Sequence, residues 1–454
     1  MISVNPTTEK QIAEYPDHSG EQVEQFLDDG AAAKKEWRRS SFQKRASLMR
    51  EVTNLLRQRQ GELARLMTAE MGKPIVAAEA EIAKCAGCCE YFSEHAEKFL
   101  AQIPAPSDAW HSYVKFEPVG LVLAIMPWNF PFWQVFRFAA PALMAGNVGL
   151  LKHAPNVPGC ALAIADIFND AGFPPGAFSS VLISDNAIAQ HLAGHPAVDA
   201  VTLTGSEKAG SRVAAEAGGA LKKTVMELGG SDAFIVLADA QIESVAKSAA
   251  EARCLNNGQS CIAAKRFIVE ESVAAKFESA IVAVMNAFRI GDPMDRATQI
   301  GPLARLDLLE NLDHQVRHSV RQGAKLLAGG NRLERKGFFY PPTVLSDVHP
   351  GMVAFDEETF GPVAAIIRAK DAADAVRLAN LSRYGLGASI WTNDLARAEA
   401  LAGQLECGSV FVNGPVKSDP RLPFGGIKKS GWGRELGEFG IREFVNVKTV
   451  WIGK

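Results

Sequence analysis

Short apolar runs alternate with helical patterns along most of this chain, and this alternation constrains the fold more than any other feature. The clearest strand and helix pairs are 148–152 with 158–171, 180–183 with 186–194, and 200–204 with 207–217. A second series begins at 233–237 and extends to a strand at 410–412. Alternation at this spacing predicts an α/β fold whose parallel sheets are covered by helices on both faces.

The two ends of the chain follow different patterns. Helical patterns cover 21–36, 41–70 and 75–100. Residues 436–454 alternate like an exposed strand that needs a partner, and 112–118 is the strand expected to join it, in the same chain or in another subunit. At 454 residues the chain is expected to form two or three domains, with Gly229-Gly230-Ser231 as the hinge between its halves.

Composition excludes several classes of protein. With 47% apolar and 22% charged residues and a net charge of -3, the chain is expected to fold, and it offers no basic surface to nucleic acid. Its seven cysteines are sparse and irregularly spaced, which argues against a disulfide framework and for a reducing compartment. The first residues lack a basic stretch followed by an apolar one, so we expect a cytoplasmic protein without an export signal.

One uncharged segment, 118–136, reaches the length of a membrane span. Pro127, Asn129 and Pro131 lie in its middle, and a bilayer-spanning helix would have to satisfy the backbone groups that the prolines free. A buried strand at 119–125, a loop at 127–131 and a helix at 132–144 explain the segment better. No membrane partner is expected.

Two motifs place a reactive side chain beside glycine. Cys261 closes the run Asn257-Gly258-Gln259-Ser260-Cys261, and a glycine there lets the backbone approach a substrate closely. Cys261 is therefore a candidate nucleophile, although a free cysteine is most often a small buried hydrophobe. Glu227 lies between an apolar strand and Gly229-Gly230, where partial burial would raise its pKa toward that of a general base. The alternative is a structural carboxylate that accepts from a backbone amide.

Two further motifs offer groups that bind anions or oxyanions. Thr204-Gly205-Ser206 lies between a strand and a helix, where backbone N–H groups suit a dinucleotide pyrophosphate, although Gly and Ser are also ordinary N-cap residues. Asn129 holds a side-chain amide between two prolines. It is either an oxyanion donor or a buried group with structural partners.

The remaining motifs are less specific. Glu358 and Phe360 combine a carboxylate with an aromatic ring, which suits ribose hydroxyls and a nicotinamide but also occurs in surface turns. Cys85, Cys88 and Cys89 fall at helical spacing without a fourth metal ligand, so core packing is favoured and no metal site is expected.

Together these motifs resemble those of the NAD(P)-dependent aldehyde dehydrogenase superfamily over essentially the whole chain. The matching residues are Pro127–Pro131 (PWNFP), Leu151-Lys152, Thr204–Ser206 (TGS), Glu227–Gly230 (ELGG), Gly258–Cys261 (GQSC), Glu358–Val363 (ETFGPV), Asn413 and Pro423–Gly426 (PFGG). Segments 152–154 and 418–423 look like those of the shorter bacterial succinate-semialdehyde dehydrogenases.

The resemblance implies an aldehyde dehydrogenase-like fold. It would have a Rossmann-type NAD(P)-binding domain (1–100 and 119–229), an α/β catalytic domain (230–428), and a small β extension (101–118 and 429–454). That extension would join subunits into a homodimer or a dimer of dimers.

The resemblance also implies a mechanism. Cys261 attacks the aldehyde carbon, and the Asn129 side chain and the Cys261 backbone N–H hold the oxyanion of the thiohemiacetal. Hydride transfer to the cofactor leaves a thioester, and Glu227 activates the water that hydrolyses it to a carboxylic acid. The residues implied to bind the cofactor are Trp128, Lys152, Pro155, Gly205, Ser206, Leu228, Glu358 and Phe360. NAD-preferring members often have Glu at the position of Pro155, where it repels a 2′-phosphate, so NADP is expected to be accepted alongside NAD.

The implied substrate is a small aldehyde, most closely succinic semialdehyde. The residues implied to bind it are Trp133, Arg137, Ser260 and Ser418. Arg137 lies among apolar and aromatic neighbours in PFWQVFRFAAP, so we do not expect an ordinary solvated charge. It either clamps the far carboxylate of the substrate or caps a buried carbonyl or pairs with a structural acid. Another aliphatic or aromatic aldehyde is the alternative substrate. A non-catalytic binding protein on this fold is the remote alternative, against which Cys261, Glu227 and Asn129 together argue.

Overall fold

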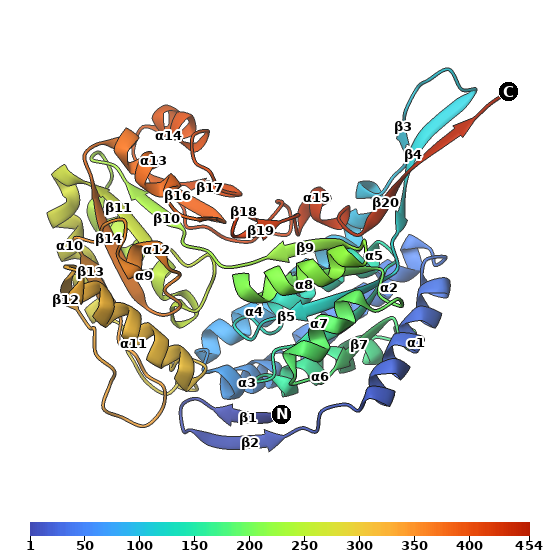
Figure 1. Cartoon of the computed structure of the whole chain (residues 1–454), viewed down its shortest axis with the longest axis horizontal. Coiled ribbons are helices and arrows are strands. Elements are labelled where there is room, and N and C mark those ends of the chain that lie inside the picture. The colour runs from blue at the N-terminus through green and yellow to red at the C-terminus, as the bar shows by residue number, and fades with distance from the viewer.

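Two α/β lobes and a projecting β ribbon make up the molecule, and the computed structural model describes all residues from 1 to 454 (Figure 1). The strands of the first lobe's main sheet are β5 (Leu121–Met126), β6 (Val148–His153), β7 (Phe178–Val181), β8 (Ala200–Thr204), β9 (Lys223–Glu227) and β19 (Gly431–Trp432). Its helices are α1 (Gly20–Trp37), α2 (Phe42–Gln58), α3 (Gln60–Met71), α4 (Ile75–Phe99), α5 (Trp133–Met144), α6 (Pro158–Asp170), α7 (Asn186–Gly194), α8 (Glu207–Gly219) and α15 (Gly437–Ile441).

The second lobe repeats this plan with a wider sheet. Its strands are β10 (Ala233–Val236), β11 (Arg266–Glu270), β12 (Lys325–Ala328), β13 (Thr343–Ser346), β14 (Val363–Ala369), β16 (Gly387–Trp391) and β17 (Ser409–Val412). Its helices are α9 (Ile242–Cys254), the short 3₁₀ helix η1 (Leu255–Gly258), α10 (Glu271–Asn286), α11 (Leu306–Arg321), α12 (Val353–Asp356), α13 (Ala372–Asn380) and α14 (Leu395–Ala402). Two small pairs complete the fold, β1 (Ile2–Asn5) with β2 (Lys10–Glu14) and β15 (Tyr384–Gly385) with β18 (Ile427–Lys428).

Both main sheets are parallel except at one edge. The strand orders are β19-β9-β8-β5-β6-β7 and β12-β13-β14-β11-β10-β16-β17. Only the edge strands β19 and β12 run antiparallel to their neighbours. The parallel α/β architecture expected from the alternation of strands and helices is therefore confirmed, because parallel strands need the covering crossover helices.

The uncharged segment at 118–136 forms the centre of the first lobe. β5 lies between β8 and β6, and every residue of α5 is buried. The expected strand, loop and helix in this segment are confirmed, with β5 at Leu121–Met126. No helix of the structure is both long enough and apolar enough to cross a membrane.

Two expected elements have different bounds. The helical pattern at 41–70 is two helices, α2 and α3, because Arg59 leaves the helical conformation at φ -93° and ψ 8°. The strand expected at 180–183 is β7 at Phe178–Val181, where the Phe178 ring packs over Gly149 of the neighbouring strand.

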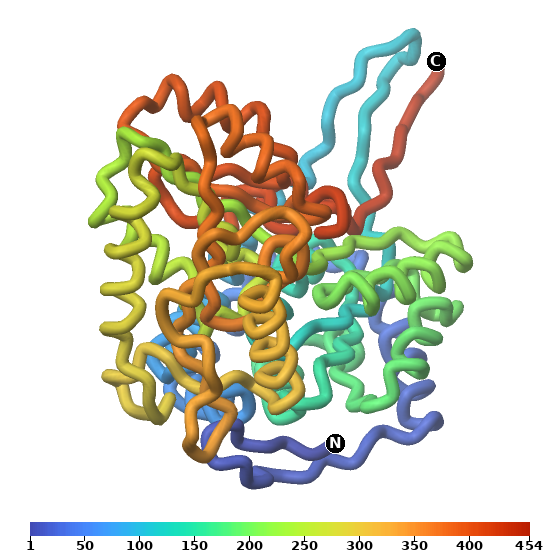
Figure 2. The backbone as a smooth tube through the Cα atoms, turned by 60° about the vertical axis from the view of Figure 1, so that its left-hand side comes forward, coloured from blue at the N-terminus to red at the C-terminus, as the bar shows by residue number.

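The ribbon contains the strand pair expected at the C-terminus. β20 (Val445–Ile452) pairs antiparallel along the whole of β4 (His111–Pro118) in the same chain, and the short β3 (Ile103–Pro104) adds to β4. Figures 1 and 2 show this ribbon extending away from both lobes. Before it enters the ribbon, the chain returns from the second lobe and adds β19 to the first sheet beside β9. The domain boundaries implied by the resemblance stay a prediction.

Candidate active site

The strand order of the first sheet creates a crevice at one edge. From β5 the chain steps to β6 and β7 on one side, then crosses back to β8 and β9 on the other. Ligands in open parallel sheets bind outside the carboxyl ends of the strands at such a reversal. The loop after β5 carries Asn129, the loop after β8 carries Ser206, and β9 ends at Glu227. The fold thus places three separately predicted side chains at the same edge.

The second lobe contributes the loop that carries Cys261. Three consecutive residues before it have left-handed backbone conformations, Asn256 at φ 54°, Asn257 at φ 58° and Gly258 at φ 75°. Asn tolerates this region better than other non-glycine residues. The Asn256 amide donates to the carbonyls of Asn129 (2.6 Å) and Gln259 (3.0 Å), which ties the Cys261 loop to the Asn129 loop of the first lobe.

Lys265 fixes the other side of the same loop. Its buried ammonium donates to the carbonyls of Ser260 (2.9 Å), Cys261 (2.8 Å) and Ala263 (3.2 Å). The same ammonium lies 3.6 Å from the carboxylate of Glu358. The position of the thiol is therefore coupled to that of the carboxylate expected to bind ribose.

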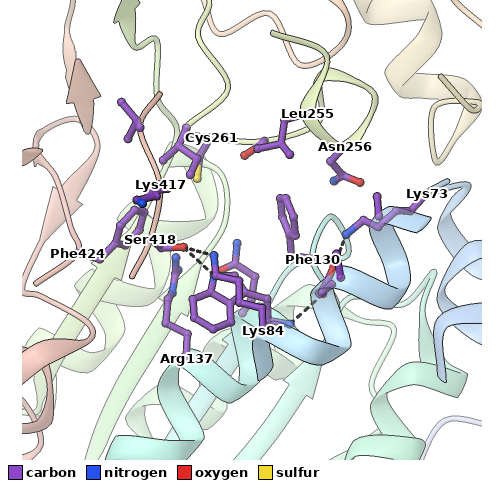
Figure 3. A pocket seen from close by; sticks show the side chains of 18 residues that line it. Lys73, Lys84, Phe130, Arg137, Leu255, Asn256, Cys261, Lys417, Ser418 and Phe424 are labelled. Carbon is purple, nitrogen blue, oxygen red and sulfur yellow. Dashed lines mark hydrogen bonds and ion pairs between the residues drawn. The ribbon is translucent and has the colours of Figure 1, made fainter. Parts of the chain in front are cut away.

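Two cavities meet at Cys261. One of about 300 Å³ is lined by all four residues implied to bind the substrate, which are Trp133, Arg137, Ser260 and Ser418 (Figure 3). The other, of about 350 Å³, is lined by Asn129 and six of the residues implied to bind the cofactor, which are Trp128, Gly205, Ser206, Leu228, Glu358 and Phe360. The thiol is thus open to a substrate and to a dinucleotide from two separate spaces.

Three predicted site residues lie outside the lining of both cavities. Lys152 is buried at the end of β6, and this burial lowers the pKa of its ammonium. Pro155 is exposed in the turn that follows β6. Glu227 is buried at the end of β9, and neither of its carboxylate oxygens has a hydrogen-bond partner within the chain.

The ionisable groups of the site are shifted chiefly by burial. Burial raises the pKa of Cys261 to about 12, although Arg137 and Lys265 oppose the shift, so the resting residue is a thiol. Burial also raises the pKa of Glu227 to about 8, again opposed by Arg137. A carboxylate with that pKa is both basic enough to accept a proton and partly ionised at neutral pH.

Two N–H donors near the thiol, one from a side chain and one from the backbone, are unpaired. The Asn129 amide donates one N–H to the Gln259 carbonyl at 3.0 Å, which leaves its second N–H without a partner. The backbone N–H of Cys261 makes no hydrogen bond within the chain. These two donors are the pair that an oxyanion on the attacked carbon requires.

Arg137 lies at the boundary between the substrate cavity and the buried interior of the protein. It lines the substrate cavity, yet its Nε pairs with the buried carboxylate of Glu435 and its Nη2 donates to the Thr204 hydroxyl at 3.3 Å. Its guanidinium also lies 4.6 Å from the centre of the Phe424 ring. The pairing with a structural acid, one of the two interpretations left open by the sequence, is therefore present. A substrate carboxylate that accepted two hydrogen bonds from the Nε edge of the Arg137 guanidinium would have to displace Glu435.

The second cavity has the features of a dinucleotide site. Ser206 caps α8 by accepting from the Ala209 N–H at 3.2 Å, and the N–H groups of Glu207 and Lys208 in the first turn have no acceptor in the chain. Free N–H groups at a helix N-terminus bind phosphate. Glu358 accepts from the Gly230 N–H at 3.0 Å. These groups fit a pyrophosphate and a ribose.

Sequence reasoning missed several residues that line the cavities. In the substrate cavity these include Lys73, Lys84, Phe130 and Phe424, and in the cofactor cavity Arg305 and Leu308. Lys84 interrupts an apolar stretch in the same way as Arg137 does, so the same signal was present for it. Phe130 and Phe424 lie within the PWNFP and PFGG motifs, although neither ring was assigned a role. Lys73, Arg305 and Leu308 have no local signal, because only the tertiary fold brings their segments to the site.

Comparisons with known proteins show which family this chain resembles. The aldehyde dehydrogenase family model matches residues 1–450. The chain is 50% identical over 452 residues to the "probable succinate-semialdehyde dehydrogenase" NADP(+) of Synechocystis sp., covering 100% of this chain and 99% of that one. It is 48% identical over 450 residues to the succinate semialdehyde dehydrogenase NAD(P)+ Sad of Escherichia coli, covering 99% and 97%. The solved structure of succinic semialdehyde dehydrogenase from Streptococcus pyogenes with NADP+ superposes with a TM-score of 0.97 at 34% identity, covering 100% of both chains.

A substitution at Gly258 tests the packing of the Cys261 loop. A Cβ at Gly258 would lie 2.2 Å from the carbonyl carbon of Gly361, in addition to the strain of φ +75°. Gly351 is the control, because it has φ +93° but a Cβ added there would have no atom within 4 Å. In urea denaturation, Gly258→Ala should lose about 1–3 kcal/mol more stability than Gly351→Ala, the usual cost of overpacking. Equal losses would mean that the loop at Gly258 is not packed this tightly against Gly361.

Proposed function

The chain belongs to the aldehyde dehydrogenase family, and on that basis we propose that it oxidises succinic semialdehyde to succinate with NADP or NAD as the hydride acceptor. The observation that carries the proposal is the meeting of two cavities at one cysteine, with basic side chains in one and a helix N-terminus in the other. The names of the two curated relatives support the choice of substrate and of both cofactors.

In the proposed reaction the Cys261 thiol gives its proton to ionised Glu227, which releases it to solvent. The sulfur forms a bond to the aldehyde carbon, and the carbonyl electrons move onto its oxygen. The unpaired N–H groups of Asn129 and Cys261 stabilise that oxyanion. Bound NADP or NAD supplies the acceptor for the hydride that leaves the tetrahedral carbon. Glu227 then takes a proton from the water that attacks the thioester, which releases the acid and restores the thiol.

The residues of the second cavity would hold the cofactor. Ser206 and the N–H groups of α8 would bind the pyrophosphate, and Glu358 the nicotinamide ribose. Lys152, which lies outside this cavity at the end of β6, would bind the adenosine ribose. Phe360 lies edge-on to Trp128 with ring centres 5.8 Å apart, and these rings would bound the nicotinamide pocket.

The ribbon supports a second part of the proposal, that subunits join into a homodimer or a dimer of dimers. Three apolar side chains of β20, Val447, Trp451 and Ile452, are exposed in the isolated chain, as is Trp110 beside β4. Exposed apolar side chains on a projecting ribbon are typical of an interaction surface.

Reduction of NADP or NAD by the purified protein tests the proposed reaction. Succinic semialdehyde should be oxidised with a higher kcat/KM than butanal, which has the same number of carbons and no carboxylate. Cys261→Ala should lower kcat at least about a thousandfold, because no other group can form the covalent intermediate. Cys407→Ala, which removes a partly buried thiol outside the site, should leave kcat unchanged. Substantial turnover by Cys261→Ala would remove Cys261 from the nucleophile role.

The raised pKa of Glu227 predicts a pH dependence. Only the ionised carboxylate can accept a proton from water, so kcat should rise with pH and level off above about 8 where thioester hydrolysis limits turnover. Glu227→Gln should slow hydrolysis by roughly 10²–10⁴-fold and leave a burst of one reduced cofactor per site in rapid-mixing experiments. The absence of both burst and turnover in a folded variant would indicate a structural role for Glu227.

Pro155 provides a test of cofactor choice. Pro155→Glu would place a carboxylate near the 2′-phosphate of NADP and should lower kcat/KM for NADP at least roughly tenfold through charge repulsion. Pro155→Gln has nearly the same size without the charge and should leave the NADP to NAD ratio within about threefold of the parent. Identical ratios in the two variants would show that other residues determine the preference.

A further inference from the structure

A third cavity lies where the ribbon leaves the first lobe (Figure 1). Its volume of about 510 Å³ is in the range of small-molecule sites. Its walls come from the chain after α1, the start of α2, the end of α4 and the base of β4. It shares no lining residue with the two cavities that meet at Cys261, so the proposed function gives it no role.

Arg45 is the buried charged residue in the wall of this cavity. It is only 5% exposed, yet its guanidinium makes neither a hydrogen bond nor an ion pair within the chain, and its enclosed Nε has no partner. Glu97 is the acid whose charge acts on it, and that exposed carboxylate lies beyond ion-pair distance. Burial accordingly lowers the pKa of Arg45 to about 10. A buried cation without a counter-ion is unfavourable unless a ligand supplies the anion.

The fold leaves a defined space for this guanidinium. The Cζ atom of Arg45 lies 4.3 Å from the centre of the Phe42 ring, which supports one face of the group. Gly146 lies beside it with φ +96°, and a Cβ at that position would clash with Nη1 of Arg45. Only glycine combines that backbone conformation with the space that the guanidinium needs. The position of the charge is therefore fixed, although no group of the chain pairs with it.

The other charged residues of the cavity do not balance Arg45. Lys115 and Glu117 pair with each other at 3.3 Å, and Glu117 also pairs with Lys448 of the neighbouring strand β20. Arg38 and Arg39 are exposed and form no ion pair. The cavity is therefore lined by three arginines that have no carboxylate partner and by one exposed glutamate, which leaves an excess of two positive charges.

We propose that this cavity binds a dianionic phosphate group, either free or carried by a small molecule. Guanidinium groups match the geometry of phosphate oxygens, and a dianion would pair with Arg45 together with Arg38 or Arg39. Phosphate fits better than a single carboxylate, because the cavity has an excess of two positive charges. A phosphate alone would leave much of the 510 Å³ unfilled, which gives room for the rest of a phosphorylated small molecule.

Isothermal titration calorimetry of the whole protein with inorganic phosphate tests this inference. Because the N-terminus of α8 also suits phosphate, the protein is first saturated with NADP. Inorganic phosphate should still bind to the parent, and glycerol 3-phosphate should compete with it. Tighter binding of the ester would indicate a phosphorylated small molecule as the ligand, and equal binding would indicate free phosphate. No binding of either compound to the parent would overturn the inference.

Variants of three positions show whether the arginines of the cavity bind the phosphate. Arg45→Met removes the buried charge and should weaken phosphate binding at least about tenfold, the effect of losing a charge-assisted contact. Arg38→Gln combined with Arg39→Gln should weaken it at least about threefold, because these residues supply the remaining donors. Arg50→Met is the matched control, since Arg50 is exposed on the same helix outside the cavity, and it should change the affinity less than about twofold. Equal losses in Arg45→Met and Arg50→Met would overturn the inference.

Thermal unfolding separates a binding role of Arg45 from a structural one. Without phosphate, Arg45→Met removes an uncompensated buried cation and should not lower Tm. Phosphate should raise the Tm of the parent and leave that of Arg45→Met unchanged. A lower Tm in Arg45→Met with unchanged phosphate affinity would assign Arg45 to the fold alone and overturn the inference. If Arg45→Met does not fold, the double variant of Arg38 and Arg39, whose changes are exposed, decides the question, and an unchanged affinity there would equally overturn it.

Discussion

The buried ammonium of Lys265 is the contact on which the geometry of the site depends. It holds three carbonyls of the loop that carries Cys261 and lies 3.6 Å from the Glu358 carboxylate. One charge therefore links the proposed nucleophile to the carboxylate proposed to bind the cofactor. The loop itself has three left-handed residues in succession, a conformation that persists only where surrounding contacts enforce it. Without Lys265 the three carbonyls would be buried and partly unsatisfied.

The site contains charged side chains whose burial is unfavourable, and this burial changes their reactivity. Glu227 and Glu435 both lie in the interior with Arg137 as their nearby cation, and burial raises the pKa of each carboxyl. Excluding water strengthens every electrostatic interaction near the thiol and shifts Glu227 into the range of a general base. Burial likewise raises the pKa of the Cys261 thiol. The buried charges therefore lower the stability of the fold but place reactive groups at the junction of the two cavities.

The parts of this structure that sequence could predict are the local ones. Apolar periodicity located most of the strands and helices, since side chains on one face of an element repeat within a few residues. The motif loops around Asn129, Ser206 and Cys261 were predictable for the same reason. The break at Arg59 was not, because α2 and α3 each continue a helical pattern and only tertiary packing separates them. Hydrogen-bond and ion-pair partners that lie far apart in the sequence could not be predicted either. Lys84 and Ser418 are separated by 334 positions, and the neutralisation of Arg137 by Glu435 has no local signature.

The two cavities that meet at Cys261 bear on the order of events during turnover. In the proposed reaction the aldehyde and the dinucleotide would reach the sulfur through different spaces, one lined from α4 and α5 and the other from the loops after β5 and β8. Neither ligand has to pass through the volume that the other occupies. The architecture is therefore compatible with a random kinetic sequence, in which the acid can leave while the dinucleotide is still bound and a spent dinucleotide can be exchanged while the acyl group remains on the enzyme.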